Sequence, residues 1–173
     1  MDRQEIQELL TIQYGAFLAR LRQMPDMQAH MAAPGKWSPA QQTEHLVKSV
    51  RPVTLALGLP KFILPLLFGR SNRPGRSYDE LVIRYKAKLA AGGRASRPFV
   101  PGTPTNLKSL YLQLERTVNK LGKRVNRFSE DQLDTLILPH PLLGKLTLRE
   151  MLYFTAYHAR HHQESIHATH ITE

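Results

Sequence analysis

The chain contains no cysteine, which excludes disulfide bonds, thiolate nucleophiles and cysteine-based zinc sites. Any metal must therefore be held by nitrogen and oxygen ligands. The N-terminal stretch, MDRQEIQELLTIQY, carries acidic residues and lacks the apolar core of a signal peptide. These two absences together predict a cytoplasmic protein.

Long apolar runs are also scarce. The one membrane-like stretch, residues 53–68 (VTLALGLPKFILPLLF), is shorter than a membrane span and is interrupted by Pro60, Lys61 and Pro65. We therefore expect a buried helix end followed by a kinked apolar segment, with no membrane association. A contiguous apolar segment could also line a pocket or form the contact of a homodimer.

Acidic residues are few beside basic ones. Fourteen Asp and Glu stand against 24 Lys and Arg, which gives a formal net charge of +10 and a pI near 10.2. Much of the excess lies in an insert at residues 61–104. Neither this insert nor a second basic run at residues 120–127 interleaves aromatic residues regularly, and no recognised DNA- or RNA-reading motif is present. The pattern therefore disfavours nucleic acid as the partner.

The basic insert has two interpretations. It is either a merely solubilising surface or a rim that attracts a small anionic substrate or cofactor to an active site. On the second interpretation, five arginines on the two long loops border the mouth of the site, namely Arg70, Arg73, Arg76, Arg94 and Arg97.

Helix starts are legible along the chain. Ser38-Pro39-Ala40-Gln41 reads as a capping box with proline at the first helical position, and similar boxes begin at Ser77 and Thr147. Long amphipathic helices are predicted over residues 3–24, 39–57, 106–128 and 148–169, with Pro52 expected to kink the second or end it early. A shorter helix covers residues 78–91, and strands should be few or absent because no segment alternates with period two. These features predict one all-α domain over residues 1–173, a four-helix bundle with one extra short helix and long basic loops.

Three histidines lie in the segment YHARHHQESI, and a fourth, His45, lies in WSPAQQTEHLV more than a hundred residues earlier. His158 and His162 are four residues apart and share one helix face. Helical phase directs this pair to the interior and His161 to the rim. Two imidazoles on one face can bind one cation, and a ligand from another helix would complete the site. On spacing alone, a metal site and a solvated polar patch remain equal alternatives.

Two other residues are expected to be structural. Trp37 precedes a helix start and suits a hydrophobic staple, which is a packing role. His140 lies between two prolines and belongs to a turn.

Trp37 followed eight residues later by His45, together with the segment HPLLGKLTLREMLYFTAYHARHH at residues 140–162 and the apolar Ile166, resembles the DinB-like superfamily. That group of small helical bundles includes metal-dependent hydrolases and bacillithiol- and mycothiol-dependent transferases and isomerases. The resemblance implies a four-helix bundle and makes His45, His158 and His162 the metal ligands.

The resemblance also implies a reaction class. A divalent transition metal, with zinc or nickel favoured by imidazole ligands, would activate water or a low-molecular-weight thiol for hydrolysis or S-transfer on a small molecule. His161 or Glu164 would act as a supporting partner or proton shuttle. Two rival hypotheses stay open: a basic binding module for nucleic acid or anionic partners, and a degenerate bundle without metal or catalysis.

Overall fold

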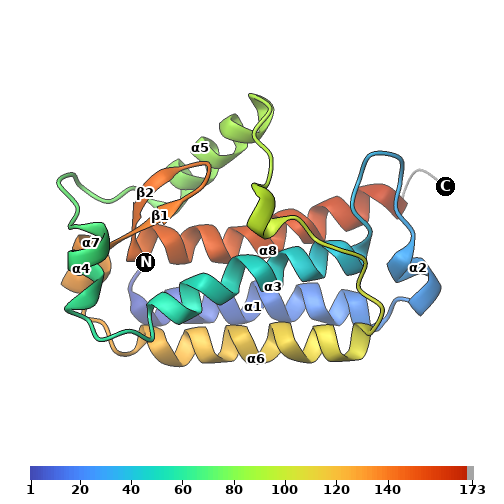
Figure 1. The fold of residues 1–173 in the computed structure, drawn as a ribbon, viewed down its shortest axis with the longest axis horizontal. Coiled ribbons are helices and arrows are strands. Elements are labelled where there is room, and N and C mark those ends of the chain that lie inside the picture. The colour runs from blue at the N-terminus through green and yellow to red at the C-terminus, as the bar shows by residue number, and fades with distance from the viewer. Residues whose placement is uncertain (171–173) are drawn as a thin grey trace.

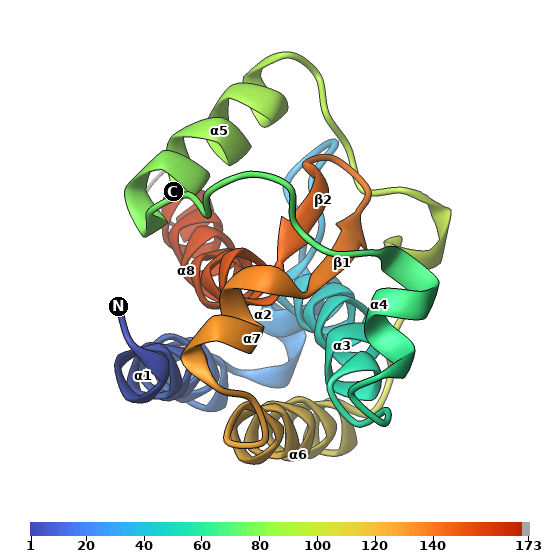
Figure 2. The same cartoon turned by 90° about the vertical axis from the view of Figure 1, so that its left-hand side faces the viewer.

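The computed structural model describes the backbone of residues 1–170 and the side chains of residues 1–166. Four long helices run alongside one another and form a bundle (Figure 1): α1 (Arg3–Arg22), α3 (Pro39–Ala56), α6 (Leu107–Val125) and α8 (Leu148–His170). Viewed from the end, the four helices occupy the corners of a quadrilateral, in which α8 and α6 each lie next to both α1 and α3 (Figure 2). The structure confirms the predicted four-helix bundle, with helix ends within a few residues of those expected.

Capping explains where the helices begin. Ser38 accepts a hydrogen bond from the Gln41 amide, and the Gln41 side chain accepts one from the Ser38 amide. The same reciprocal pair joins Thr147 and Glu150 at the start of α8. Such caps satisfy amides that have no partner within the helix, and each contributes about 1 kcal/mol.

Pro52 does not end α3 early, because the helix continues to Ala56. The missing hydrogen bond of a proline costs about 3 kcal/mol in a helix interior. Burial of Val50, Val53 and Leu57 on the same helix face offsets that cost. Of the two alternatives expected of Pro52, an early end of the helix is therefore wrong.

Shorter elements surround one long face of the bundle and its two ends (Figures 1 and 2). Helix α5 matches the predicted extra helix, whereas α2, α4 and the 3-10 turn η1 were not foreseen as helices. The short elements are α2 (Asp26–His30), α4 (Ile63–Phe68), α5 (Tyr78–Ala90), η1 (Arg97–Phe99) and α7 (Glu130–Thr135). Two short strands, β1 (Ile137–His140) and β2 (Gly144–Thr147), pair antiparallel in a hairpin with Ile137 opposite Thr147.

A buried ion cluster fastens the segment before α5 to the start of α8. The Glu150 carboxylate is fully buried and accepts two hydrogen bonds from the Arg73 guanidinium, at 2.8 and 2.7 Å. Arg76 donates to it from its guanidinium at 3.0 Å and from its backbone amide at 2.9 Å. Burial acts to raise the pKa of Glu150, but these hydrogen bonds prevail and hold it below its usual value. The cluster therefore holds α5 against the bundle.

Among the described residues, none of the helices combines the length and the apolar character that a membrane crossing requires.

Candidate metal centre

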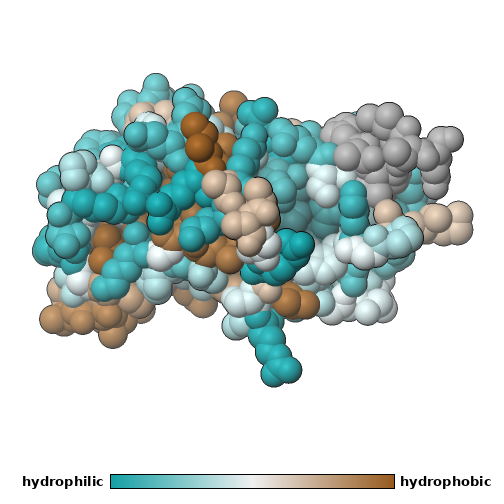
Figure 3. Space-filling view, turned by 90° about the horizontal axis from the view of Figure 1, so that it is seen from above, coloured by the Kyte–Doolittle hydropathy of each residue, from teal (hydrophilic) through white to brown (hydrophobic). Residues whose placement is uncertain are grey.

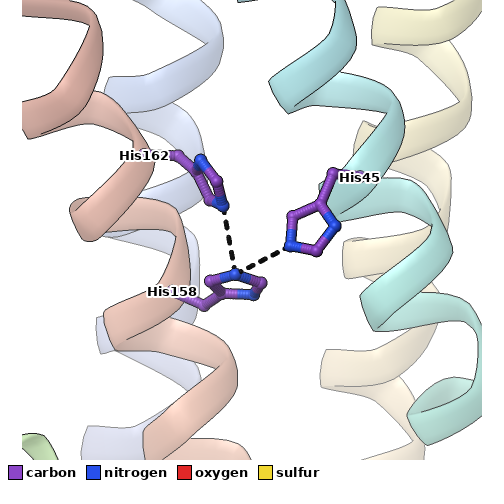
Figure 4. A group of neighbouring side chains, drawn as sticks. All are labelled: His45, His158 and His162. Carbon is purple, nitrogen blue, oxygen red and sulfur yellow. Dashed lines mark hydrogen bonds between the residues drawn. The ribbon is translucent and has the colours of Figure 1, made fainter. Parts of the chain in front are cut away.

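Three imidazoles converge between α3 and α8 (Figure 4). His45 comes from α3, and His158 and His162 lie one turn apart on α8; all three side chains are buried. The Nε2 atom of His158 lies 3.1 Å from Nε2 of His45 and 3.1 Å from Nε2 of His162. The structure thus brings together the three residues selected from the sequence as metal ligands.

The outer nitrogens of two of these rings are held by hydrogen bonds. Nδ1 of His45 lies 2.7 Å from the carbonyl oxygen of Phe99, which can only accept, so Nδ1 carries the proton. Nδ1 of His162 lies 2.9 Å from the side-chain oxygen of Gln42, whose amide nitrogen donates to the Trp37 carbonyl at 3.0 Å. Both rings therefore present an unprotonated Nε2 to the centre, which is the tautomer that a metal ligand needs.

The spacing of these nitrogens suits a bound cation. His158 can donate one proton from Nε2 to either His45 or His162, so one of the two 3.1 Å nitrogen pairs has no proton between its atoms when all rings are neutral. Three imidazole nitrogens bound to zinc at ~2.0–2.1 Å with tetrahedral angles lie about 3.3 Å apart. Two of the observed separations, both 3.1 Å, lie near that spacing, all three ligand atoms lie within 4.8 Å of one another, and nitrogen donors suit a divalent transition metal.

Burial keeps the three rings neutral. It lowers the pKa of His158 and of His162 well below the ordinary value, and the neighbouring imidazoles lower both further. Burial also lowers the pKa of His45, although the hydrogen bond to Phe99 opposes the shift. Protons therefore compete little with a metal for these nitrogens at neutral pH.

The three histidines open into a cavity of about 600 Å³. It is lined by residues of α3, α8 and α5, of the segment around η1 and of the β1–β2 hairpin. Seen from above, this face carries apolar side chains between hydrophilic ones (Figure 3). A largely apolar cavity of this size with a few converging polar groups is typical of a small-molecule site.

A model of one protein family matches most of the chain. The model of the DinB superfamily matches residues 9–166, a span that contains all three histidines. The chain belongs to the DinB superfamily. No match was found among curated proteins.

Two solved structures share this DinB superfamily fold. TT2238, described as a four-helix bundle protein, superposes with a TM-score of 0.62 at 19% identity, covering 96% of this chain and 99% of its own. YfiT from Bacillus subtilis, described as a probable metal-dependent hydrolase with an unusual four-helix bundle topology, superposes with a TM-score of 0.65 at 16% identity, covering 96% and 84%. At these identities the likeness establishes the fold.

The two proposed helper residues of this DinB superfamily member lie in different surroundings. His161 is half-buried on the cavity wall, with its ring centroid 5.3 Å from that of His162 and 5.8 Å from that of Tyr85. Burial lowers its pKa, so its ring is also neutral near pH 7. Glu164 is exposed, accepts a hydrogen bond from Arg160 at 2.8 Å and does not line the cavity. The structure therefore brings His161, but not Glu164, to the centre.

The arginine prediction needs correction. Of the five arginines expected at the mouth, Arg94 alone lines the cavity. Arg73 and Arg76 are committed to the buried Glu150, and Arg70 pairs through its backbone with Leu136. Clustering in the sequence could not show this, because the carboxylate that holds two of them lies more than seventy residues away.

Gln42 and the Phe99 carbonyl were not foreseen. Gln42 precedes His45 by three residues and lies on the same buried helix face, so helical phase could have found it. The Phe99 carbonyl belongs to the main chain of the insert and leaves no signal in the sequence. The Trp37 ring packs against His45, with ring centroids 4.9 Å apart, and also lines the cavity.

His140 has the structural role expected of it. Its Nδ1 accepts hydrogen bonds from the amides of Leu142 and Leu143, both at 3.1 Å, and so closes the hairpin turn. Burial lowers its pKa to about 4. This ring also lines the cavity, where its pKa keeps it neutral.

Proposed function

We propose that this protein is a metal-dependent hydrolase that acts on a small molecule. His45, His158 and His162 hold one divalent metal, zinc or nickel, and the substrate lies in the adjoining cavity. One observation carries the proposal: three buried Nε2 atoms, two of them on rings with fixed tautomers, converge at the wall of a 600 Å³ cavity. The description of YfiT, which shares the fold, favours hydrolysis over S-transfer.

The residues of this chain divide the work. A divalent metal held by the three imidazoles would act as a Lewis acid and would lower the pKa of water. The Phe99 carbonyl and Gln42 keep two ligands in the required tautomer. His161 lies on the same wall with a neutral ring and accepts a proton from the group that reacts there. The apolar wall limits water around the reacting groups.

The proposal is tested by metal content and activity measured together. Protein purified without a histidine tag or nickel column should contain about one metal per chain by elemental analysis, or acquire it on addition of zinc or nickel. His162→Ala should lose that metal, whereas His161→Gln should keep it. His30→Ala, which changes an exposed histidine on α2, is the matched control.

Hydrolysis is then assayed on a panel of esters and amides, with and without chelator. Chelator-sensitive turnover that disappears in His162→Ala supports the proposal. Protein that takes up no stoichiometric metal contradicts it and favours the degenerate bundle. Bound metal with transfer of a thiol, and no hydrolysis, would assign the other reaction.

A further inference from the structure

The cavity extends well beyond the three histidines. Along α3 it is lined at His45, Ser49, Val53 and Ala56, positions spaced by four, four and three residues on one helix face. At 1.5 Å per residue, this stripe is about 16 Å long. The cavity is therefore a trough that starts at the imidazoles and follows α3 toward its C-terminal end.

Helix α8 forms the other side of this trough. It runs antiparallel to α3 (Figure 1), so that its lining residues Phe154 and Met151 continue from His158 in the same direction as the α3 stripe. Both side chains are buried. Apolar residues of other elements, namely Phe68 of α4 and Leu138 of β1, also line the cavity.

Polar side chains gather at the metal end of the trough. Farther along, Ser49 and His140 also line it, but Ser49 donates to the His45 carbonyl and Nδ1 of His140 accepts from two backbone amides, so these groups are bonded within the protein. Besides the three histidines, His161 and Tyr85 lie at the metal end, and each contacts His158 or His162 through its ring. Among the described lining residues there is no Asp or Glu, and the one Lys or Arg side chain is that of Arg94, which is exposed. Such a wall offers no carboxylate to pair with a cationic substrate and too few cations for a polyphosphate.

We infer that the trough binds an elongated acyl compound, an ester or amide of a medium-chain carboxylic acid. Its reacting carbonyl lies at the three histidines, and its apolar chain extends between α3 and α8 toward the hairpin. The identity of the reacting end rests on the proposed function. The position of the apolar chain rests on the lining residues alone, so it can be tested without catalysis.

Trp37 provides a direct signal for the test. It is the single tryptophan of the chain, and it lines the cavity beside His45. Its fluorescence is followed while straight-chain carboxylates from butanoate to dodecanoate are added to zinc-loaded and to chelated protein. Affinity should rise about fourfold for each added methylene, the equivalent of about 0.8 kcal/mol, until the chain fills the trough.

Two variants at neighbouring positions test where the apolar part of the bound carboxylate lies. Ala56→Phe places a ring at the far end of the trough and should weaken binding of decanoate at least tenfold while butanoate binds as in wild type. Leu55→Phe, which changes an exposed residue about 100° around α3 from Ala56 that does not line the cavity, should bind the whole series as wild type does. Circular dichroism checks folding, and Leu142→Asp, at the half-buried hairpin tip on the cavity wall, serves as a second variant with the same expected loss.

The outcomes separate this inference from the proposed function. The inference is overturned if affinity does not depend on the length of the carboxylate. It is also overturned if long carboxylates bind Ala56→Phe and Leu142→Asp as tightly as wild type. If the dependence appears in a protein that takes up no metal, the trough is established and the hydrolase proposal fails. If metal binds and esters are cleaved without dependence on chain length, the hydrolase proposal stands and the inference about the trough fails.

Discussion

Replacing Gln42 by methionine is expected to weaken metal binding by about ten- to a hundredfold. Gln42 is buried, and its side chain links two groups: its oxygen accepts from Nδ1 of His162 at 2.9 Å, and its nitrogen donates to the Trp37 carbonyl at 3.0 Å. Methionine has a similar length and can make neither hydrogen bond. The substitution therefore tests orientation of the ligand with little change in packed volume.

The magnitude follows from what is left unpaired. In the variant, the Nδ1 proton of His162 is buried without an acceptor, which costs about 1–3 kcal/mol. The ring can recover by rotating or by moving the proton to Nε2, and either change removes the lone pair that faces the centre. A tenfold to hundredfold loss of affinity corresponds to about 1.4–2.7 kcal/mol, which lies in the same range.

The dissociation constant is measured by competition with a chromophoric chelator at neutral pH. Gln42→Glu should restore binding, because a carboxylate oxygen accepts from Nδ1 in the same way. Gln4→Met, an exposed position on α1, is the matched control. A Gln42→Met protein with native circular dichroism and a dissociation constant within about threefold of wild type would refute the orienting role.

Three further predictions concern stability. Removal of metal by a chelator should leave the helical signal in far-UV circular dichroism unchanged, because the apolar core is buried by all four helices; loss of the signal would make the site structural. The second prediction concerns His140 in chelated protein, whose pKa is about 4 in the folded state and 6.5 in the unfolded state. As the pH falls from about 6.5 to 4, the unfolded state therefore binds this proton before the folded state does, and the free energy of unfolding decreases. Through this histidine, the free energy of unfolding of wild type should fall by up to about 1.4 kcal/mol per pH unit. The His140→Asn variant keeps an acceptor for the turn amides, and its free energy of unfolding, measured with urea, should fall less steeply with pH. Equal pH dependence in the two proteins would contradict the lowered pKa of His140. Glu150→Gln should lower the free energy of unfolding by about 2–4 kcal/mol, somewhat less than for a fully buried cluster because Arg73 and Arg76 are 30% and 26% exposed; a loss below about 0.5 kcal/mol would show that the cluster is dispensable.

The long helices could be predicted because their signals are local. A capping box and a 3.6-residue apolar period lie within each segment and depend on no distant partner. Helix α4 escaped prediction because six residues, one of them Pro65, are too few to show a period. The β1–β2 hairpin escaped because its strands do not alternate in the sequence; Ile137, Leu138 and Leu146 are buried through tertiary packing.

The metal centre could likewise be predicted only where its signals are local in the sequence. Helical phase alone placed His158 and His162 on one inward face, and the family resemblance supplied His45. What holds these rings, and what the basic insert does, depended on contacts between segments more than fifty residues apart, such as the Phe99 carbonyl with His45. No pattern along the chain records such pairings.

The cavity wall has a consequence for how this chain can change over evolutionary time. Helices α1 and α6 contribute none of the described lining residues, and the three histidines belong to α3 and α8. A third or so of the lining comes instead from one continuous stretch, residues 61–104, whose path is fixed by the contact of Arg73 and Arg76 with Glu150. Exchange of that single stretch for another would reshape the cavity while the histidines were inherited unchanged, provided that the new segment again bound the buried Glu150 carboxylate and again offered His45 a carbonyl acceptor. The candidate metal ligands and much of the remaining cavity wall thus lie on different segments of the chain, which meet at the Phe99 carbonyl and at Glu150.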